Sequence, residues 1–456
     1  MIFITDTYPQ LFIKLPAVII SSMKIAIVGY GKQGVSAYEY WSEGNDITIR
    51  DQAPITNPPK NALIETGEHY LDDLDQFDLI IRSPKLYPKD MVDANGPEIL
   101  KKVTTNTNEF FKVCPTKNII GVTGTKGKGT TSTLITKILE SLGKRVILGG
   151  NIGIPPLDLL KENIQPDDYV VLELANFQLI DLKYSPPIAA CLMVTPEHLD
   201  WHIDMEDYKL SKKQLFIHQK PNDTAVYFAN NDVSKEIVDA GPAKKIPYFK
   251  NPGAIIENDE IKIEGNLVCR ISELKLPGKH NLENICAAIT VCWQIEKDVE
   301  KIKQGVVNFT SLPHRIELVR EFNKVKFYND SFASVSDATI AAIESIPETK
   351  ILIVGGFDRM LPLEHFVSKV KENSATIGKI LLIGQSAKRV SEEFTKNGYS
   401  NFIISTADNM EYIVNQALSL SSPGEAVVLS PGFPSFDMFK DFEERGILYK
   451  KAVNNL

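Results

Sequence analysis

The chain has 456 residues, of which 43% are hydrophobic and 24% are charged, and its formal net charge is −8. A chain of this length forms two or three domains with ample apolar core. The acidic balance argues against nucleic acid or an anionic membrane surface as a partner. Five scattered cysteines without a Cys-x-x-Cys pair argue against disulfides and zinc, and fit a reducing cytoplasm.

Residues 1–22 are interpreted as an extension of uncertain status. Their apolar pieces are interrupted by Asp6, Lys14 and two prolines, and no basic segment precedes them. Neither a signal peptide nor a membrane-spanning helix fits this pattern. Met23 begins a regular strand pattern, which indicates an upstream extension or a start codon assigned too early. No transmembrane segment is predicted elsewhere, and we expect a cytoplasmic protein.

The first predicted domain, residues 23–113, begins like a Rossmann fold. A buried strand at 24–28 leads into the loop Gly29-Tyr-Gly31-Lys-Gln-Gly34, and a second strand at 47–50 ends in Asp51. Alone, this pattern favours NAD, with Asp51 on a ribose. Only one further strand, 79–81, follows, so half a Rossmann fold that binds a nucleotide diphosphate is the better interpretation. The expected contacts are Gly29, Tyr30, Gly31, Lys32, Gln33 and Asp51.

A second glycine loop opens the central predicted domain, residues 114–312. The strand 118–122 leads into Gly124-Thr-Lys-Gly127-Lys128, and Lys128 begins a long helical pattern. Such a loop presents backbone N–H groups, the positive end of a helix dipole and a lysine to phosphate. The expected ATP contacts are Gly124, Thr125, Lys126, Gly127, Lys128, Gly129, Thr130 and Thr131.

The loop departs from the usual phosphate-loop motif in two places. Val122 occupies the position of the first glycine, and Gly129 follows the lysine where a hydroxyl commonly binds Mg²⁺. Thr130 or Thr131 must then supply that hydroxyl. The alternative is a glycine-rich turn that caps an ordinary helix.

Other strands of the central domain bring polar residues to the same edge of a mainly parallel sheet. The strand 145–148 precedes Asn151, the strand 169–172 delivers Glu173, and the strand 189–194 precedes His198. A carboxylate and an imidazole at neighbouring strand ends are placed for a divalent ion beside a triphosphate. Taken singly, Glu173 could be a solvated strand end and His198 a turn residue.

The third predicted domain, residues 313–456, begins at Pro313, which interrupts the helical and strand patterns. Strands at 326–329, 351–354, 380–383 and 426–429 alternate with helices, which is typical of another doubly wound domain. The sequence therefore predicts an α/β protein with three domains: a Rossmann-like N-terminal domain, a central phosphate-loop ATPase domain with a mainly parallel sheet, and a Rossmann-like C-terminal domain.

These motifs together resemble the Mur ligase family, in this order along all three domains. The loop Gly124–Lys128 resembles the family's ATP loop, and 171–178 and 194–200 resemble stretches whose Glu and His hold Mg²⁺. Lys212, four residues after Tyr208, has the spacing of a lysine that is carbamylated in the family and reaches a second Mg²⁺. The resemblance thus implies metal ligands Thr130, Glu173, His198 and carbamylated Lys212, with Lys128, Glu173, His198 and Lys212 as the catalytic set.

The resemblance also implies further ligand contacts. Leu276–Asn284 is similar to the adenine-binding motif, and the run Ser435–Gly446 is similar to the C-terminal substrate motif of the D-glutamate-adding branch. The implied ATP contacts are Asn281, Asn284, Arg315 and Asp330. The implied substrate contacts are Ser83, Pro84, Asn151, Gln178, Ser331, Phe332, Arg359, Ser435 and Phe442. An alternative role for Asn281 is to cap the N-terminus of its helix, and this role is compatible with adenine binding.

The implied activity is ATP-dependent amide bond formation through an acyl phosphate. D-glutamate would be added to UDP-N-acetylmuramoyl-L-alanine in peptidoglycan precursor synthesis, with two Mg²⁺, by a monomer that binds neither nucleic acid nor membrane. Alternatives are a related ligase for another acceptor such as L-glutamate, a folylpolyglutamate-synthase-like ligase, a nicotinamide oxidoreductase, and a non-enzymatic nucleotide switch. The Phe-Asp-Met-Phe stretch at 436–439 argues against the folylpolyglutamate alternative.

One departure bears on the acceptor. The family commonly has Asp-Ser-Lys-Ala-Thr where this chain has Asp330-Ser-Phe332-Ala-Ser334, so an aromatic ring replaces a cation in the substrate site. A dicarboxylate still needs positive partners, because an unpaired buried carboxylate is costly. We expect Ser435 and the N-terminus of a following helix to bind one carboxylate, and Arg359 or Lys440 to bind the other.

Overall fold

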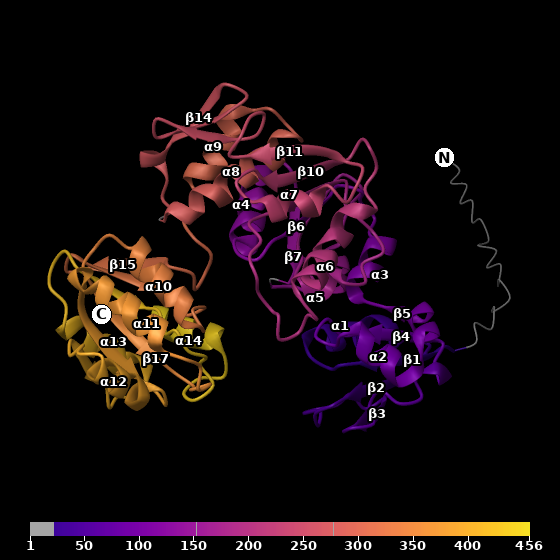
Figure 1. Ribbon diagram of the computed structural model, residues 1–456, viewed down its shortest axis with the longest axis horizontal. Coiled ribbons are helices and arrows are strands. Elements are labelled where there is room, and N and C mark those ends of the chain that lie inside the picture. Colours follow the sequence, from indigo (N-terminus) through magenta and orange to yellow (C-terminus); the bar gives the residue numbers. More distant parts are fainter. Residues whose placement is uncertain (1–21, 152, 277) are drawn as a thin grey trace, which may run out of the picture. The chain divides into compact units, whose positions relative to one another are not determined.

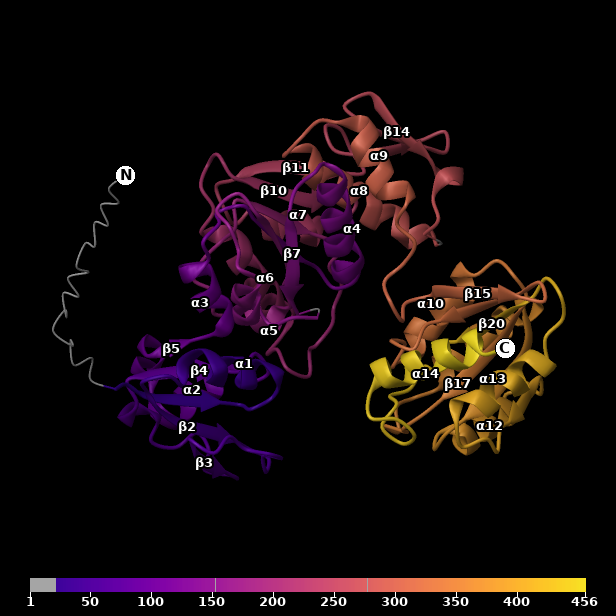
Figure 2. The same cartoon turned by 180° about the vertical axis from the view of Figure 1, so that it is seen from behind.

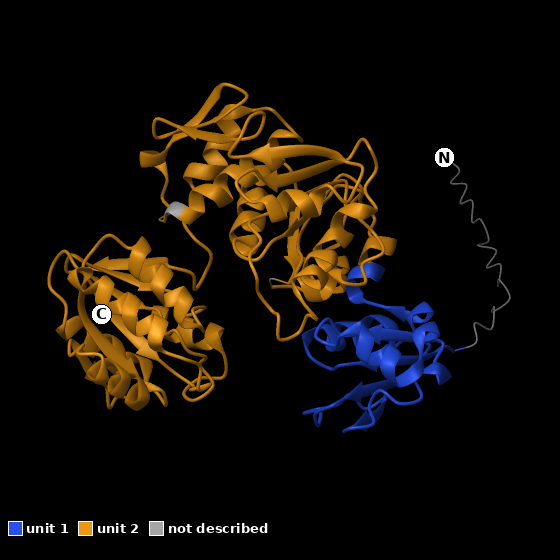
Figure 3. Cartoon of the chain, in the orientation of Figure 1, with its two compact units in different colours: residues 1–109 blue, residues 110–456 orange. Residues whose placement is uncertain are grey.

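The computed structural model of the protein describes residues 22–151, 153–276 and 278–456 (Figures 1 and 2), so the predicted extension lies, apart from Ser22, outside the described residues. The chain divides into two compact units, and the division falls after Glu109, within the helix α3 (Asn106–Val113) (Figure 3). The predicted α/β class with mainly parallel sheets is confirmed. The domain boundaries at 113/114 and 312/313 remain predictions.

The first unit is built on a five-stranded parallel sheet with the strand order β3-β2-β1-β4-β5. Alternate residues of β1 face opposite sides, and all but the first are buried, as a sheet covered on both faces requires. The elements are β1 (Lys24–Val28), α1 (Lys32–Trp41), β2 (Asp46–Asp51), β3 (Leu63–Thr66), η1 (Leu74–Gln76), β4 (Leu79–Arg82), α2 (Pro88–Asn95), η2 (Pro97–Lys101), β5 (Val103–Thr104) and α3 (Asn106–Val113).

The second unit begins with a six-stranded parallel sheet, in the order β11-β10-β9-β6-β8-β7. On one face, α4, α8 and α9 bury a hydrophobic core against the sheet. On the other face, the side chain of Leu215 of α6 lies close to Gly121 of β6. The elements are β6 (Ile119–Thr123), α4 (Lys128–Ser141), β7 (Val146–Gly150), η3 (Pro156–Glu162), β8 (Tyr169–Glu173), α5 (Asn176–Leu179), β9 (Ile188–Cys191), α6 (Met205–Ile217), β10 (Thr224–Phe228), α7 (Asp232–Val238), β11 (Lys244–Tyr248), α8 (Lys279–Trp293) and α9 (Val299–Val307).

A small antiparallel sheet follows β11, and the sequence patterns did not predict it. Its strands are β12 (Ile255–Glu257), β13 (Glu260–Ile263) and β14 (Asn266–Arg270), and η4 (Ile271–Glu273) follows. The strands are three to five residues long, too short for a clear alternating pattern. Ile261, Ile263 and Val268 nevertheless extend the core that α4 and α8 form.

The C-terminal part of the second unit has a six-stranded sheet in the order β15-β16-β20-β17-β18-β19, in which β15 alone is antiparallel. Leu352 and Val354 face α10 to α12, and Ile351 and Ile353 face α13 and α14, so both faces are buried (Figures 1 and 2). The elements are β15 (Glu317–Phe322), β16 (Val325–Asn329), α10 (Ser336–Ser345), β17 (Lys350–Gly355), α11 (Glu364–Glu372), η5 (Ser374–Thr376), β18 (Ile377–Ile383), α12 (Ala387–Lys396), β19 (Phe402–Ile404), α13 (Met410–Ser419), β20 (Ala426–Leu429) and α14 (Phe442–Asn454).

Four local expectations are wrong. The first sheet has two strands besides the one expected at 79–81, and both escaped prediction because β3 is exposed along its length and β5 has two residues. The strand predicted at 189–194 ends at Cys191, because the residues beyond Leu192 contact the phosphate loop: the Met193 carbonyl accepts from the Thr125 N–H, and the Thr195 N–H donates to the Thr125 hydroxyl. No helix starts at Ser435, since the N–H groups of Met438 and Phe439 both return to its carbonyl in a turn, and α14 begins only at Phe442. Asn281 does not cap α8, whose N-cap is Gly278.

No helix among the described residues is long and apolar enough to cross a membrane.

Candidate active site

The phosphate loop connects β6 to α4, and its glycines are required by its geometry. Gly124 and Gly127 have φ values of +150° and +86°, conformations that side chains rarely adopt. A Cβ on Gly127 would overlap Oδ1 of Asn284, and one on Gly124 would lie 2.7 Å from Cβ of Leu192. Lys128 Nζ donates hydrogen bonds to the carbonyl oxygens of Gly124 (3.1 Å) and Thr125 (2.9 Å). The lysine is thus folded back over the loop, where it can meet an anion.

Lys212 lies behind the same loop and is completely buried. Its Nζ donates to the carbonyl oxygen of Gly124 (3.1 Å) and lies 4.4 Å from the centre of the Tyr208 ring. Burial, together with the positive charge of Lys128, lowers the pKa of Lys212 to about 7. A large fraction of this amine is therefore neutral at physiological pH.

Thr125 links the loop to the segment after β9 and to α6. Its hydroxyl donates to the carbonyl oxygen of Thr195 (3.0 Å), accepts from the Thr195 N–H (3.0 Å), and lies 3.0 Å from the Tyr208 hydroxyl. These bonds hold the loop, the His198 segment and the Lys212 helix in one arrangement.

Glu173 stands at the end of β8 and is 4% exposed. Asn151 Nδ2 donates to its Oε1 (2.7 Å), while its buried Oε2 has no hydrogen-bond partner among the described residues. Burial lowers the pKa of Lys128, and the negative charges of Glu173 and Glu197 act in the opposite direction. Glu173 and Lys128 therefore share one electrostatic environment.

His198, the predicted second metal ligand, is exposed and has a φ of +57°. Its ring packs against Phe177 at 4.8 Å between centres. The described residues contain no group of three or more His, Cys, Asp or Glu side chains arranged to hold a metal ion. Glu173 and His198 alone thus do not form a complete protein-ligated metal site.

The segment before α6 carries a histidine that sequence reasoning missed. His202 is buried, its Nδ1 lies 2.5 Å from Asp207 Oδ2, and its Nε2 lies 2.8 Å from Asn176 Nδ2. Its ring also packs edge-on against Tyr208 at 5.2 Å. Asn176 of α5 and Asp207 of α6 are thus the two polar partners of the His202 ring.

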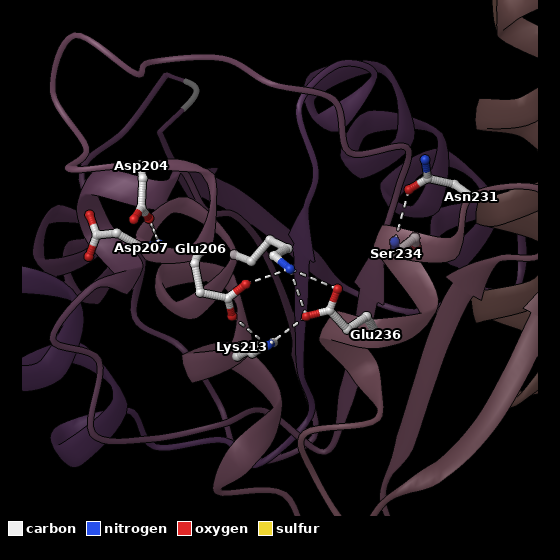
Figure 4. Close-up of polar contacts among 8 residues, drawn as sticks. Asp204, Glu206, Asp207, Lys213, Asn231, Ser234 and Glu236 are labelled. Carbon is white, nitrogen blue, oxygen red and sulfur yellow. Dashed lines mark hydrogen bonds and ion pairs between the residues drawn. The ribbon is translucent and has the colours of Figure 1, made fainter.

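Capping residues at the N-terminal ends of α6 and α7 fix the position of the segments around His198 and His202. Asp204 and Asn231 cap the two helices by accepting the N–H groups of Asp207 and Ser234 (Figure 4). Asn231 also accepts from the Val194 N–H (3.1 Å), which anchors the segment before His198.

The predicted adenine residues lie against the phosphate loop. Asn284 Nδ2 donates to Asn281 Oδ1 (3.0 Å), and Thr131 Oγ1 donates to Asn284 Oδ1 (3.3 Å). The Thr131 hydroxyl is therefore engaged, whereas no hydrogen bond holds the Thr130 hydroxyl among the residues that the structure describes. Of the two candidate hydroxyls, Thr130 is the more available.

The first unit brings its own predicted residues together. The N–H groups of Tyr30 (2.7 Å) and Ala53 (3.0 Å) donate to the two carboxylate oxygens of Asp51. A Cβ on Gly29 would lie 2.5 Å from Cβ of Ser83. Gly31 and Lys32 are exposed at the start of α1, Gln33 is half-buried there, and Pro84 lies half-buried beyond Ser83. These residues lie together at the carboxyl ends of β1, β2 and β4.

The C-terminal site residues surround Asp330, at the end of β16. Asp330 accepts from Ser430 Oγ (2.7 Å) and from the Ile316 N–H (3.2 Å), and burial raises its pKa to about 7. Ser331 Oγ donates to the Phe442 carbonyl (2.8 Å). Ser435 is buried at the start of the turn before α14.

A second missed residue, Arg445, organises this region. It is 1% exposed and donates to Ser331 Oγ (3.0 Å), the Ser331 carbonyl (2.8 Å) and the Phe433 carbonyl (3.1 Å). Arg445 lies within the run Ser435–Gly446 beside Glu443 and Glu444, and its local pattern does not distinguish it from these charged neighbours. Glu197, which acts on both Lys128 and Lys212, was also missed.

Two predicted cations remain exposed on the C-terminal part. Among the described residues, no hydrogen bond or ion pair engages the side chain of Arg359 or that of Lys440. The loop that carries Arg359 is fixed, because Arg389 binds both carboxylate oxygens of Asp358 (2.6 and 2.7 Å). Phe357 N–H also donates to the carbonyl of Pro434 (2.8 Å), which places this loop beside Ser435.

Comparison with known proteins agrees with this arrangement. Residues 122–292 match the Mur ligase middle domain. Among solved structures, a MurF ligase from Thermotoga maritima in complex with ADP has a TM-score of 0.59 and 18% identity, covering 95% of this chain and 96% of its own. A UDP-N-acetylmuramate–alanine ligase from the same organism has a TM-score of 0.59 and 17% identity, covering 95% and 99%. These structures share the fold.

Curated relatives found by sequence have a higher identity to this chain than these solved structures. A UDP-N-acetylmuramoylalanine–D-glutamate ligase of Clostridium tetani is 34% identical and covers 96% of this chain and 98% of its own length. The enzyme of the same name from Acetivibrio thermocellus is 37% identical, with 96% and 97% covered. Since such relatives match nearly the whole chain, it belongs to the Mur ligase family, in the group of UDP-N-acetylmuramoylalanine–D-glutamate ligases.

Proposed function

We propose that the protein is an ATP-dependent ligase that joins the amine of D-glutamate to the carboxylate of UDP-N-acetylmuramoyl-L-alanine in peptidoglycan precursor synthesis. The observation that carries this proposal is a complete phosphate loop, with Lys128 folded over it, in a chain that matches D-glutamate ligases over almost its whole length. A nicotinamide oxidoreductase or a nucleotide switch would not need the Asp330 and Ser435 region.

The chemistry follows from the need for a leaving group on a carboxylate. A carboxylate oxygen of the alanyl end attacks the γ-phosphorus of ATP, the bond to the bridging oxygen breaks, and an acyl phosphate and ADP result. The amine of glutamate then attacks the acyl carbon, and inorganic phosphate leaves with the bonding electron pair while the amine loses a proton. Lys128 and the loop N–H groups neutralise charge that accumulates on the γ-phosphoryl oxygens.

The residues around Glu173 fit a Mg²⁺ ion, as the family implies. The orphaned Glu173 Oε2 is a buried anionic oxygen without a donor, and Mg²⁺ prefers one or two carboxylates completed by substrate phosphates and water. Thr130, Glu173 and His198 would hold such ions, with Lys212 as a carbamate. When bound, Mg²⁺ would supply electrostatic stabilisation and orientation of the phosphates.

Lys212 fits carbamylation for two reasons. Its pKa of about 7 leaves the amine partly neutral, and the neutral amine is the form that adds to CO₂ with release of a proton. An unmodified lysine is also an unsuitable neighbour for Lys128, since like charges in a buried site destabilise each other. A carbamate would replace that repulsion with attraction.

The acceptor site is proposed at the Ser331, Ser435 and Phe442 region. The turn after Ser435 replaces the expected helix. One carboxylate of glutamate would therefore be bound by the Ser435 hydroxyl and by backbone N–H groups of this turn other than those of Met438 and Phe439, which already donate to the Ser435 carbonyl. Arg359 or Lys440 would bind the other, and the position of Arg359 beside Ser435 favours Arg359. The UDP group is proposed to bind at Asp51, Ser83 and the α1 loop of the first unit.

The decisive experiment is phosphate release from ATP with purified full-length protein. Release should require UDP-N-acetylmuramoyl-L-alanine and D-glutamate together, and L-glutamate should give little. Release with L-glutamate alone would select the related ligase with another acceptor, and release with a folate acceptor would select the folylpolyglutamate alternative. We further propose a cytoplasmic monomer, which light scattering with size exclusion would check for mass.

A further inference from the structure

Phe332, the residue that replaces a lysine of the family, is in contact with Arg315. The Arg315 guanidinium carbon lies 3.8 Å from the centre of the Phe332 ring. The ring itself is held in place: Phe332 N–H donates to the His314 carbonyl (3.0 Å), and the ring packs edge-on against Phe442 at 5.0 Å. One side of this aromatic ring is therefore occupied by a cation.

The stacked arrangement leaves Arg315 able to bind a ligand. Burial lowers the pKa of Arg315, and the carboxylates of Glu173 and Asp330 raise it, so the guanidinium lies among charges of the ATP region. Among the described residues, no hydrogen bond or ion pair uses its N–H groups. An aromatic ring attracts a guanidinium that lies over its flat face, and this contact uses none of the five N–H donors of the guanidinium. The donors thus remain available for phosphate oxygens.

We propose that Phe332 is a positioning residue for the ATP half of the reaction, which acts by holding Arg315 through its ring face. This inference rests on the proposed function and assigns Phe332 to Arg315 rather than to glutamate. A lysine at 332 would place a second cation against the guanidinium, which is unfavourable in a desolvated site. The Phe332 ring therefore orients the Arg315 guanidinium, and the guanidinium N–H groups remain available to bind phosphate oxygens.

The test separates the ATP site from the acceptor site. F332L keeps an apolar side chain but removes the ring, and it should weaken binding of a non-hydrolysable ATP analogue and raise the KM for ATP, each by about two- to thirty-fold. The KM for glutamate should change less than twofold. F332W restores a ring and should recover most of the affinity, whereas F332K should lose more than F332L.

A matched control and a double variant complete the design. Arg320 lies over the ring of Phe322 at 5.0 Å on β15, so F322L removes a similar contact elsewhere and should leave both KM values unchanged. In an R315A background, in which no cation faces the ring, F332L should have little further effect, because the two residues act as one unit. A rise in the KM for glutamate with unchanged ATP affinity, or an undiminished effect of F332L in R315A, would overturn the proposal.

The ATP-analogue measurement needs no acceptor. If wild type fails to release phosphate with D-glutamate, the proposed function fails, while a loss of analogue affinity in F332L and its recovery in F332W would still support the role of Phe332.

Discussion

At the scale of single residues, Lys212 and Lys213 are neighbours with opposite surroundings. Lys212 is buried behind the phosphate loop, whereas Lys213 forms ion pairs with Glu206 (3.3 Å) and Glu236 (2.8 Å) (Figure 4). We predict that K212A is nearly inactive and is partly rescued by a short carboxylic acid such as acetate, which supplies the missing anionic oxygen. Steady-state phosphate release with increasing acetate measures the rescue.

K213A is the control for that prediction, because exposed ion pairs contribute little. It should retain most of the activity and should not respond to acetate. Equal loss in both variants without rescue would indicate damage to α6 rather than a missing ligand.

Asp330 makes the stability of the protein depend on pH in a predictable direction. Its pKa is raised to about 7 by burial, whereas an aspartate in an unfolded chain titrates near 3.9. The folded state therefore holds a proton that the unfolded state releases, so this stabilisation is complete below about pH 4 and is lost as the pH rises through about 7. D330N is neutral throughout, and its urea midpoint relative to wild type should increase from pH 5 to pH 8. A difference that stays constant between the two pH values would contradict this.

Arg359 is predicted to recognise the second carboxylate of the acceptor. R359A should raise the KM for D-glutamate about tenfold or more while the KM for ATP stays constant, because a charge-assisted contact to the acceptor is lost. K440A removes an equally exposed cation farther along the turn and should have a smaller effect. If neither variant raises the KM for glutamate, the acceptor site has been assigned to the wrong residues.

At the scale of elements, the loop between β6 and α4 needs glycine for two reasons: the backbone conformation, and the lack of room for a side chain. Comparing Gly127 with Gly143 separates these two effects. Gly127 has a φ of +86° and a Cβ there would overlap Asn284, whereas Gly143 has a φ of +81° with no heavy atom within 4 Å of its added Cβ among the described residues. G127A should raise the KM for ATP about tenfold or more. G143A should cost about 1 kcal/mol of stability and leave that KM unchanged.

Thermal unfolding and ATP kinetics of both variants check this prediction. Similar kinetic losses in G127A and G143A would show that backbone strain, transmitted along α4, matters more than the contact with Asn284.

The elements that sequence patterns predicted are those whose signals are local. The parallel strands are continuous apolar runs, and the strand end at Glu173 and the loop at Lys128 follow directly from them. His202 could not be assigned, because its partners Asn176 and Asp207 come from two different elements. The turn after Ser435 was mistaken for a helix, since its apolar spacing resembles a helical pattern while two N–H groups return to a single carbonyl.

At the scale of the whole molecule, the proposed reaction needs residues from parts of the chain far apart in sequence. Lys128 follows the phosphate loop at the start of α4, Glu173 is the last residue of β8, and Asp330 and Ser331 follow β16. Arg315 lies in the segment between α9 and β15, and the charges of both Glu173 and Asp330 influence its pKa. This segment is therefore the natural place for a movement that assembles the site.

We predict that Pro313 and its flanking residues act as a hinge that closes when ligands bind. An acyl phosphate hydrolyses in water, so the site must exclude water once the intermediate forms, and closure of the C-terminal part over the phosphates would achieve this. Solution scattering should show a smaller radius of gyration with ATP analogue and UDP-N-acetylmuramoyl-L-alanine together than with neither. R315K should reduce that change, because its lysine cannot bridge phosphate oxygens with a planar fork. Identical scattering profiles with and without saturating ligands would show that the site is assembled before the substrates arrive, and the hinge would then have no role in protecting the intermediate.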